Sequence, residues 1–197
     1  MIVTKKMFDF TALAVMENNE IKEVTLSKLM GKNGVILFFY PKDFTFVCPT
    51  EIIAFNNKLK EFKELGYNVV GCSTDNEFSH LAWKKQPVAE GGLGDIQYPL
   101  VSDIKKEIAR QYDVLFDDAV ALRASFLIDE KQVVRHAVIN DLPLGRSIDE
   151  MIRMANALNF NREHGDVCPA NWAKGKEAMK ANPNGVAEFL KNNAKKL

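Results

Sequence analysis

The sequence predicts an α/β domain in which a mixed central sheet is flanked by helices. Residues 34–40 form a continuous run of branched and aromatic apolar residues, which is typical of a strand buried on both faces. Residues 49–65 place apolar side chains three and four positions apart, as in an amphipathic helix. Residues 68–73 form a second apolar run. The segment 34–74 is therefore expected to be a βαβ unit with parallel strands and a right-handed crossover.

The boundaries of this unit are marked by residues that end regular structure. The first strand ends at Pro41, and Gly66 stands where a glycine C-cap would end the helix. Ser147 and Glu150 form a capping box that begins the last expected helix. The linker of the expected hairpin lacks glycine and leaves its turn type open. The further elements expected are a helix at 77–85, a glycine-rich loop at 86–98, a strand at 98–101, a helix at 104–112, hairpin strands at 124–129 and 133–139, and a helix from 148.

The chain is expected to divide into a main domain, residues 1–163, and a C-terminal arm, residues 164–197. In the arm the composition shifts towards Lys, Asn, Gly and Ala with few large apolar residues, which favours a loosely packed segment. In an α/β sheet of this kind, an active site is expected where a strand end meets a helix N-terminus.

Composition and charge exclude several classes of function. Lys plus Arg and Asp plus Glu both number 26, so no excess of positive charge favours nucleic acid as a partner. No apolar run approaches the ~20 residues of a membrane span, and the N-terminal lysines are not followed by the apolar region of a signal peptide. The three cysteines are too few for a secreted disulfide framework. We expect a cytoplasmic protein in which any disulfide is transient.

Cys48 lies at the expected start of the first helix, directly before Pro49, and proline is favoured at the first helical position. Free backbone N–H groups and the helix dipole favour an anion there, and hence the reactive thiolate. The alternative is a small apolar filler. No second cysteine follows three positions later, so a partner thiol must come from elsewhere. Thr45 could hydrogen-bond the thiolate, and Pro41 could wall the site against water.

Two motifs resemble those of the peroxiredoxins. Residues 41–51, PKDFTFVCPTE, resemble the peroxidatic motif, with Pro41, Thr45 and Cys48 in the family spacing. Residues 167–172, VCPANW, resemble the resolving-cysteine motif of the typical two-cysteine class, and the similarity is closest to the bacterial alkyl hydroperoxide reductase type. The resemblance covers almost the whole chain. It implies a thioredoxin-like fold with an N-terminal extension and an exchanged C-terminal arm, in a homodimer that assembles into a decamer.

The resemblance also implies a reaction. The protein would be a thiol-specific peroxidase that reduces hydrogen peroxide and organic hydroperoxides to water and alcohols, without a cofactor or metal. Cys48 would become a sulfenic acid, and Cys168 of the other subunit would form a disulfide with it. A dithiol reductant protein, either a flavoprotein reductase or a thioredoxin-like protein, would restore both thiols. A thiol buried at a helix start lies outside disulfide distance, so catalysis should include local unfolding.

Attack on a peroxide places negative charge on both the sulfur and the leaving oxygen, and an arginine can stabilise both. Arg123 matches the catalytic arginine of the family, Arg146 a second arginine, and Glu51 the carboxylate that holds them. Position alone favours a surface charge for Arg123. Glu51 and Arg146 could equally form an ordinary exposed ion pair.

The remaining cysteine and the histidines are expected to be structural. Cys72 ends a buried strand and matches no catalytic position. The three histidines share no metal-ligand spacing with the cysteines; they are His80, His136 and His164.

Residues 91–94, GGLG, match the loop found in peroxiredoxins that are sensitive to over-oxidation, but the tyrosine of the C-terminal partner motif is absent. No tyrosine follows Tyr112 in the sequence. We therefore expect resistance to inactivation by peroxide.

Two other functions remain open at this point. A thiol-disulfide oxidoreductase also places a cysteine at a helix start, although its second cysteine is missing here. A holdase-type chaperone ring is compatible with the assemblies of the family.

Overall fold

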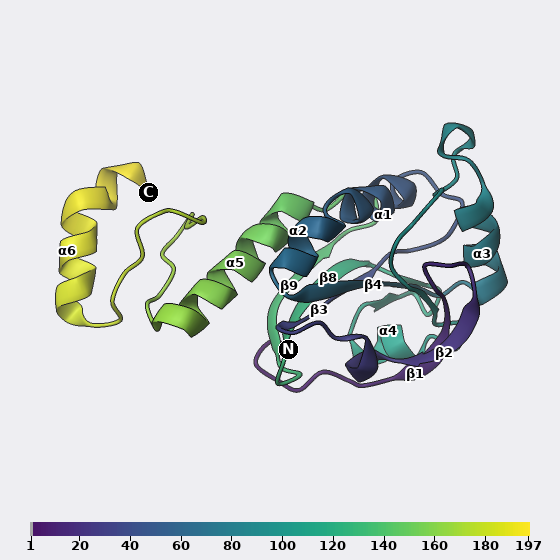
Figure 1. The fold of residues 1–197 in the computed structure, drawn as a ribbon, viewed down its shortest axis with the longest axis horizontal. Coiled ribbons are helices and arrows are strands. Elements are labelled where there is room, and N and C mark those ends of the chain that lie inside the picture. The colour runs from purple at the N-terminus through teal and green to yellow at the C-terminus, as the bar shows by residue number, and fades with distance from the viewer. Residues whose placement is uncertain (1) are drawn as a thin grey trace. The chain divides into compact units, whose positions relative to one another are not determined.

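The computed structural model describes residues 2–197, the side chain of Lys196 excepted (Figure 1). A seven-stranded mixed sheet has the order β2-β1-β5-β4-β3-β8-β9. Its strands are β1 (Thr11–Val15), β2 (Ile21–Thr25), β3 (Gly34–Phe39), β4 (Tyr67–Ser73), β5 (Leu100–Ser102), β8 (Arg123–Asp129) and β9 (Val134–Asn140). The helices are α1 (Cys48–Asn57), α2 (Leu59–Glu64), α3 (Glu77–Lys85), α4 (Glu107–Gln111), α5 (Ile148–His164) and α6 (Pro183–Asn193). Short 3-10 helices lie at Leu26–Leu29, Val88–Glu90 and Ala194–Lys196, and β6 (Leu115–Phe116) pairs with β7 (Val120–Ala121).

The pairing of the strands confirms the predicted α/β class. β3 runs parallel to β4, and β4 runs parallel to β5, so the βαβ unit forms as expected. β8 pairs antiparallel with β3, and β8 and β9 form the predicted hairpin. The C-terminal end of β3 and the start of β8 therefore lie next to each other, and eight residues connect the end of β3 to the start of α1.

Alternating side chains of β3 bury both faces of the sheet. Phe38 stacks on Phe55 of α1 with ring centroids 4.2 Å apart, while Phe39 contacts Tyr112, just after α4, at 5.3 Å. Figure 1 accordingly shows α1 and α2 on one side of the sheet and α4 on the other. Each such aromatic ring contributes about 1.5–3 kcal/mol by leaving water. The packing of Phe38 on Phe55 fixes the position of α1 on this face of the sheet.

Several elements differ from their predicted bounds or were not predicted. The hairpin of β1 and β2 at the sheet edge was not predicted. The helix predicted at 49–65 is divided at Lys58 into α1 and α2, although both halves bury the same apolar face. The helix predicted at 104–112 begins only at Glu107, because the Asp103 carboxylate accepts hydrogen bonds from the backbone N–H groups of Ile108 and Ala109.

The chain forms two compact units, residues 1–148 and 149–197. The predicted boundary after residue 163 falls at the end of α5, within the second unit, and stays a prediction. In the second unit Trp172 and Phe189 are buried, and Val167 pairs with Met179 in an antiparallel bridge. Phe189 is the one buried residue of α6, so loose packing of the C-terminal arm stays a prediction. Among the described residues, no helix combines the length and the apolar character needed to cross a membrane.

Candidate active site

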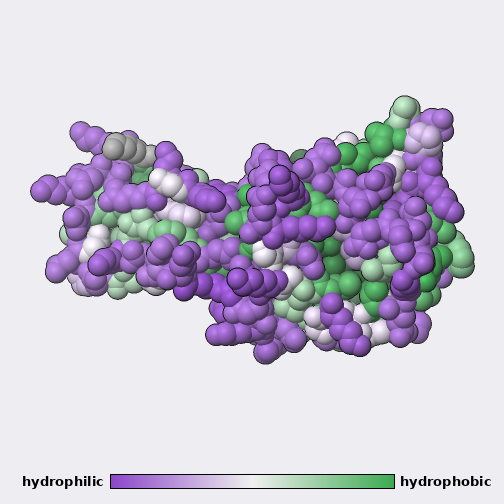
Figure 2. Space-filling model, viewed as in Figure 1, coloured by the Kyte–Doolittle hydropathy of each residue, from purple (hydrophilic) through white to green (hydrophobic). Residues whose placement is uncertain are grey.

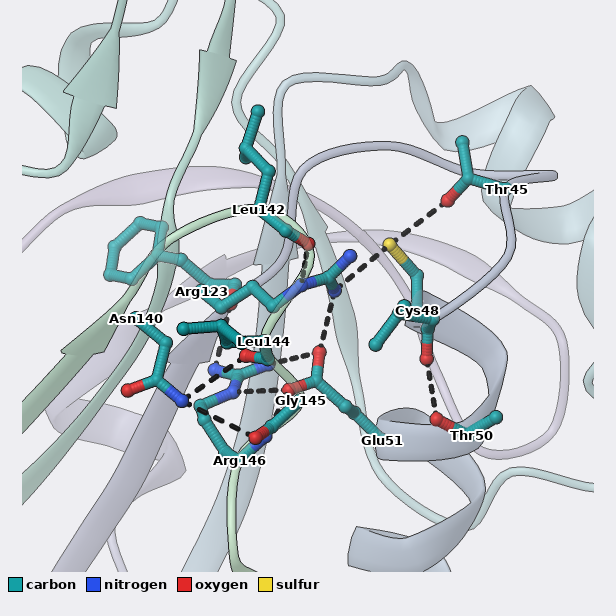
Figure 3. Close-up of polar contacts among 12 residues, drawn as sticks. Thr45, Cys48, Thr50, Glu51, Arg123, Asn140, Leu142, Leu144, Gly145 and Arg146 are labelled. Carbon is teal, nitrogen blue, oxygen red and sulfur yellow. Dashed lines mark hydrogen bonds and ion pairs between the residues drawn. The ribbon is translucent and has the colours of Figure 1, made fainter.

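Cys48 is the first residue of α1, and its side chain is fully buried. Val47 is the N-cap and Pro49 the second helical residue, so the sulfur lies at the positive end of the helix dipole. Two donors contact the sulfur: the Thr45 hydroxyl at 3.0 Å and Nη1 of Arg123 at 3.4 Å (Figure 3). The Thr45 hydroxyl, the Arg123 guanidinium and the start of α1 therefore all direct positive or partial positive charge at the sulfur.

Thr45 can follow the protonation state of the cysteine. Its Oγ1 lies 2.7 Å from the Lys42 carbonyl and 3.0 Å from the sulfur, but a hydroxyl has only one proton to donate. Beside a thiol, the hydroxyl donates to the carbonyl and accepts from S–H. Beside a thiolate, it turns and donates to the sulfur. The same hydroxyl thus has a partner in both states.

Arg123 begins β8 and is only 4% exposed, so the interpretation as a surface charge was wrong. Its Nε donates to the Leu142 carbonyl at 2.6 Å, which fixes the plane of the guanidinium. Its Nη1 donates to Oε2 of Glu51 at 2.8 Å as well as facing the sulfur. One arginine therefore contacts both the carboxylate and the reactive atom.

Arg146 and Glu51 form a buried bidentate ion pair rather than an exposed one, since the side chain of each is 2% exposed. Nε of Arg146 donates to Oε1 of Glu51 at 2.8 Å, and Nη2 donates to Oε2 at 2.9 Å. Nη1 donates to the carbonyls of Phe39 and Ala124, at the end of β3 and in β8. Arg146 thereby ties α1 to the sheet.

Two opposing effects determine the pKa of Glu51. Burial alone would raise it, but hydrogen bonds from Arg146 and the charges of Arg146 and Arg123 outweigh that effect and lower the pKa below its ordinary value. The carboxylate is charged at neutral pH. Arg123, Arg146 and Glu51 together carry one net positive charge, and Arg123 is the member that contacts the sulfur.

The other first-unit residues named from the sequence lie around this centre or away from it. Pro41 is buried directly after β3, on the connection to α1. Cys72 is fully buried in the core at the end of β4, and burial raises its pKa well above the ordinary value. It is held as a neutral thiol. His80 is bonded to Asp43 rather than to a cysteine. Within residues 2–197, no group of three His, Cys, Asp or Glu side chains is arranged to hold a metal ion.

Cys168 lies in the second unit, where its thiol donates to the Ala157 carbonyl of α5 at 3.5 Å. Burial raises the pKa of Cys168, and the charge of Arg153 opposes that shift. Arg153 also donates to the Trp172 carbonyl at 2.6 Å and pairs with Glu150. This arrangement holds the segment around Cys168 folded and its thiol protonated.

Sequence reasoning missed two parts of the first unit's site. One is the set of backbone carbonyls that orient the arginines, which no residue type reveals. The other is a buried polar cluster formed by Tyr40, Asp43, Ser79 and His80, next to the connection that carries Thr45. A signal for it was present, because Asp43 lies within the motif at 41–51.

Comparisons with known proteins agree on one family. The AhpC/TSA family matches residues 3–137, and the C-terminal domain of 1-Cys peroxiredoxin matches residues 157–192. The chain is 61% identical to alkyl hydroperoxide reductase C of Helicobacter pylori strain J99 over 198 residues, covering 100% of both chains. The crystal structure of the reduced 2-Cys peroxiredoxin of Plasmodium vivax has a TM-score of 0.94 at 49% identity, covering 97% of this chain and 99% of that one. Plasmodium yoelii Prx1a, in a form modified at the N-terminus that makes an artifactual octamer, has a TM-score of 0.77 at 54% identity, covering 86% and 98%.

Proposed function

Because this chain belongs to the AhpC/TSA family and is a peroxiredoxin, a thiol peroxidase with an antioxidant role, we propose that Cys48 attacks the hydroperoxide and Cys168 resolves the product. The observation that carries the assignment of Cys48 is its buried sulfur between the Thr45 hydroxyl and the Arg123 guanidinium. Cys72 lacks such donors and is a neutral core thiol.

In the first step, the Cys48 thiolate attacks the terminal oxygen of the hydroperoxide. An S–O bond forms, the O–O bond breaks, and the leaving oxygen takes the electron pair and a proton to become water or an alcohol. The cysteine is oxidised to a sulfenic acid and the peroxide is reduced. Arg123 lies where it can donate to the sulfur and to the departing oxygen as charge moves between them, and its hydrogen bond to Leu142 keeps it in place before the reaction.

In the second step, the Cys168 thiolate attacks the sulfenic sulfur, a disulfide forms, and hydroxide leaves as water after protonation. Cys48 is fully buried and Cys168 belongs to a separately folded unit, so both segments must loosen first. We propose that the disulfide joins two subunits of a homodimer. The resemblance of residues 167–172 to the resolving motif supports this pairing.

We propose further that the homodimers assemble into a decamer. In the first unit, apolar side chains reach the surface between hydrophilic ones (Figure 2). The exposed large apolar residues there include Phe44, Phe46, Phe78 and Ile104. Exposed apolar groups of this size are typical of association surfaces. Sedimentation velocity of the reduced protein tests the assembly, and a concentration-independent monomer would contradict it.

The reducing partner is proposed to be a dithiol protein, either a flavoprotein reductase or a thioredoxin-like protein, acting in the cytoplasm. The three cysteines are too few for a secreted disulfide framework, which supports a reducing compartment. Subcellular fractionation tests the location, and reduction of the isolated disulfide form by each class of reductant tests the partner.

Peroxide consumption with dithiothreitol as reductant tests the proposed catalytic residue. Cys48→Ser should abolish turnover of hydrogen peroxide and of an organic hydroperoxide. Cys72→Ser is the matched control, because it removes a buried thiol without touching the site, and it should retain turnover. Retained activity in Cys48→Ser would assign the chemistry to another residue.

A further inference from the structure

A buried ion pair lies beside the peroxidatic segment, which we define as residues 41–47, the connection between β3 and Cys48. His80 Nδ1 is 2.7 Å from Oδ2 of Asp43, and both side chains are at most 1% exposed. Tyr40 donates its hydroxyl to Oδ1 of Asp43 at 2.9 Å, and Ser79 donates to Oδ2 at 2.8 Å. Removing any one partner would leave a buried charge with an unsatisfied contact, which is costly.

The main chain of Asp43 is anchored as firmly as its side chain. Its backbone N–H donates to Oδ2 of Asp75 at 2.9 Å, and Asp75 is in turn held by Ser73 at the end of β4. The next residue, Phe44, has φ of 55°, a left-handed conformation that costs energy for a residue with a bulky side chain. Such a conformation persists only where the surroundings fix it. Thr45 follows immediately, so the anchor at Asp43 determines where its hydroxyl lies.

The ring of His80 is held from both sides. Nε2 faces the Val101 carbonyl at 3.2 Å, and Nδ1 faces the Asp43 carboxylate at 2.7 Å. A carboxylate is a stronger acceptor than a carbonyl, so the N–H at Nδ1 is the contact that holds Asp43.

Tyr40 completes the anchor as a second donor to Asp43, through its hydroxyl. Burial and the charge of Asp43 raise the pKa of Tyr40 well above its ordinary value, so this phenol keeps its proton and remains a donor.

We propose that Asp43 and His80 are positioning residues for the peroxidase reaction: their pair holds the peroxidatic segment so that Thr45 reaches the Cys48 sulfur, and loss of the pair lets the segment unwind more easily. The proposal rests on the proposed roles of Cys48 and Cys168. It adds residues that touch neither the peroxide nor the sulfur.

Single-turnover kinetics separate sulfenic acid formation, which the pair should accelerate, from disulfide formation, which it should slow. Sulfenic acid formation is measured in a Cys168→Ser background, and disulfide formation in the otherwise unchanged chain. In His80→Gln, we expect sulfenic acid formation to slow roughly tenfold and disulfide formation to accelerate by a similar factor, the scale of one hydrogen bond to a charged group. Tyr40→Phe, which removes only a hydroxyl, should shift both rates in the same directions by less.

Val35→Ala is the matched control, because Val35 is a fully buried core residue at the start of β3, away from the segment. It should lower the melting temperature and leave both rates unchanged. Unchanged rates in His80→Gln, or equal rate changes in Val35→Ala, would overturn the proposal. If the chain without either substitution forms no sulfenic acid or no disulfide, the proposed function fails instead.

Hydrogen exchange adds a readout that loss of stability alone would not produce. Protection of residues 40–50, corrected for intrinsic exchange rates, is compared in the reduced forms of the unchanged chain, His80→Gln and Val35→Ala. Protection of this segment should fall roughly tenfold more in His80→Gln than protection of the rest of the chain, whereas Val35→Ala should not single it out. Equal protection of the segment in His80→Gln and the unchanged chain would show that the pair does not control it.

Discussion

Arg123 and Arg146 both contact Glu51, but they perform different tasks. Arg146 donates hydrogen bonds to Glu51 and to backbone carbonyls of the sheet, so it maintains the position of α1 relative to the sheet. Arg123 places one nitrogen between Glu51 and the sulfur, so it can respond to charge at the reacting atoms. Substitution of Arg123 should therefore change the chemical step, whereas substitution of Arg146 should first disturb the packing of α1.

Arg123→Met should slow sulfenic acid formation by about 10²–10³-fold, the usual loss when one preorganised donor is removed from a site of developing charge. The measurement is single-turnover peroxide reduction in a Cys168→Ser background. Arg135→Met is the control, because Arg135 pairs with Asp129 and is 41% exposed. A loss below about tenfold would show that Arg123 does not stabilise the transition state.

Glu51→Gln should make stability less dependent on pH in the acid range. The folded protein holds the pKa of Glu51 below its ordinary value of 4.5, so the ionised carboxylate stabilises the fold above pH 4.5. This contribution is lost as the pH falls through the lowered pKa. Urea unfolding at pH 7 and pH 3.5 should thus show a difference between the two proteins that shrinks on acidification. Glu64→Gln, at an exposed carboxylate, should show little effect at either pH.

The sequence predicted which side chains form the site, but not the backbone groups that hold them in place. Cys48 and Thr45 follow from local pattern, because a cysteine before Pro49 marks a helix start and Thr45 lies three residues earlier. Arg123 and Arg146 required the family resemblance, since each is brought in by a distant strand or loop. The carbonyls that orient them could not be predicted at all, because every residue type has one.

At the scale of elements, the start of α1 and the segment around Cys168 are both held closed by contacts within their own units. Cys168 is protonated and donates to Ala157, while Arg153 fixes the Trp172 carbonyl. Resolution therefore needs both release of the segment and loss of the thiol proton.

The rate of disulfide formation should keep rising with pH beyond the ordinary thiol pKa of 9.0, because the pKa of Cys168 is raised in the folded unit. A raised pKa also means that the folded unit loses stability as the pH rises from 9.0 through that pKa. Arg153→Gln should shift the profile to still higher pH, and Arg153→Lys should shift it less. The measurement is quenched-flow formation of the disulfide dimer, and a rate that levels off near pH 7 would contradict it.

Elements with a strong apolar period were predicted, and those without one were not. β3 is a continuous apolar run that is buried throughout, and β4 is buried at every residue except Asn68. The edge strand β2 alternates weakly and carries charged residues, so its signal resembled a loop. In α6 the apolar stripe is short, but Asn182 and Pro183 provide an N-cap and a favoured first residue that could have revealed the helix.

At the scale of the whole molecule, the balance between resolution and further oxidation decides how the enzyme survives peroxide. The loop at residues 91–94 is ordered, with Trp83 donating to the Gly91 carbonyl at 2.9 Å. The tail offers Phe189, which is buried in the second unit, but no tyrosine. In peroxiredoxins that are sensitive to over-oxidation, this loop packs on a C-terminal motif with a tyrosine and slows unwinding of the peroxidatic helix start. The loop is present in this sequence, but the tyrosine of that motif is missing.

We expect little sulfinic acid at Cys48 across a peroxide titration during turnover, measured by mass spectrometry of the peptide that contains it. A Cys168→Ser variant is the control, because without a resolving thiol the sulfenic acid should proceed to sulfinic acid. A sulfinic acid yield in the unchanged protein that approaches the yield of this variant would contradict the expectation.

The central claim, that Cys48 reacts and Cys168 resolves across two subunits, is tested most directly by intact mass and non-reducing gel mobility after one equivalent of hydrogen peroxide. The unchanged protein should give a disulfide-linked dimer, Cys168→Ser should stop at a sulfenic acid on Cys48, and Cys48→Ser should remain reduced. A disulfide in Cys168→Ser would contradict the account and assign resolution to Cys72 or to an external thiol.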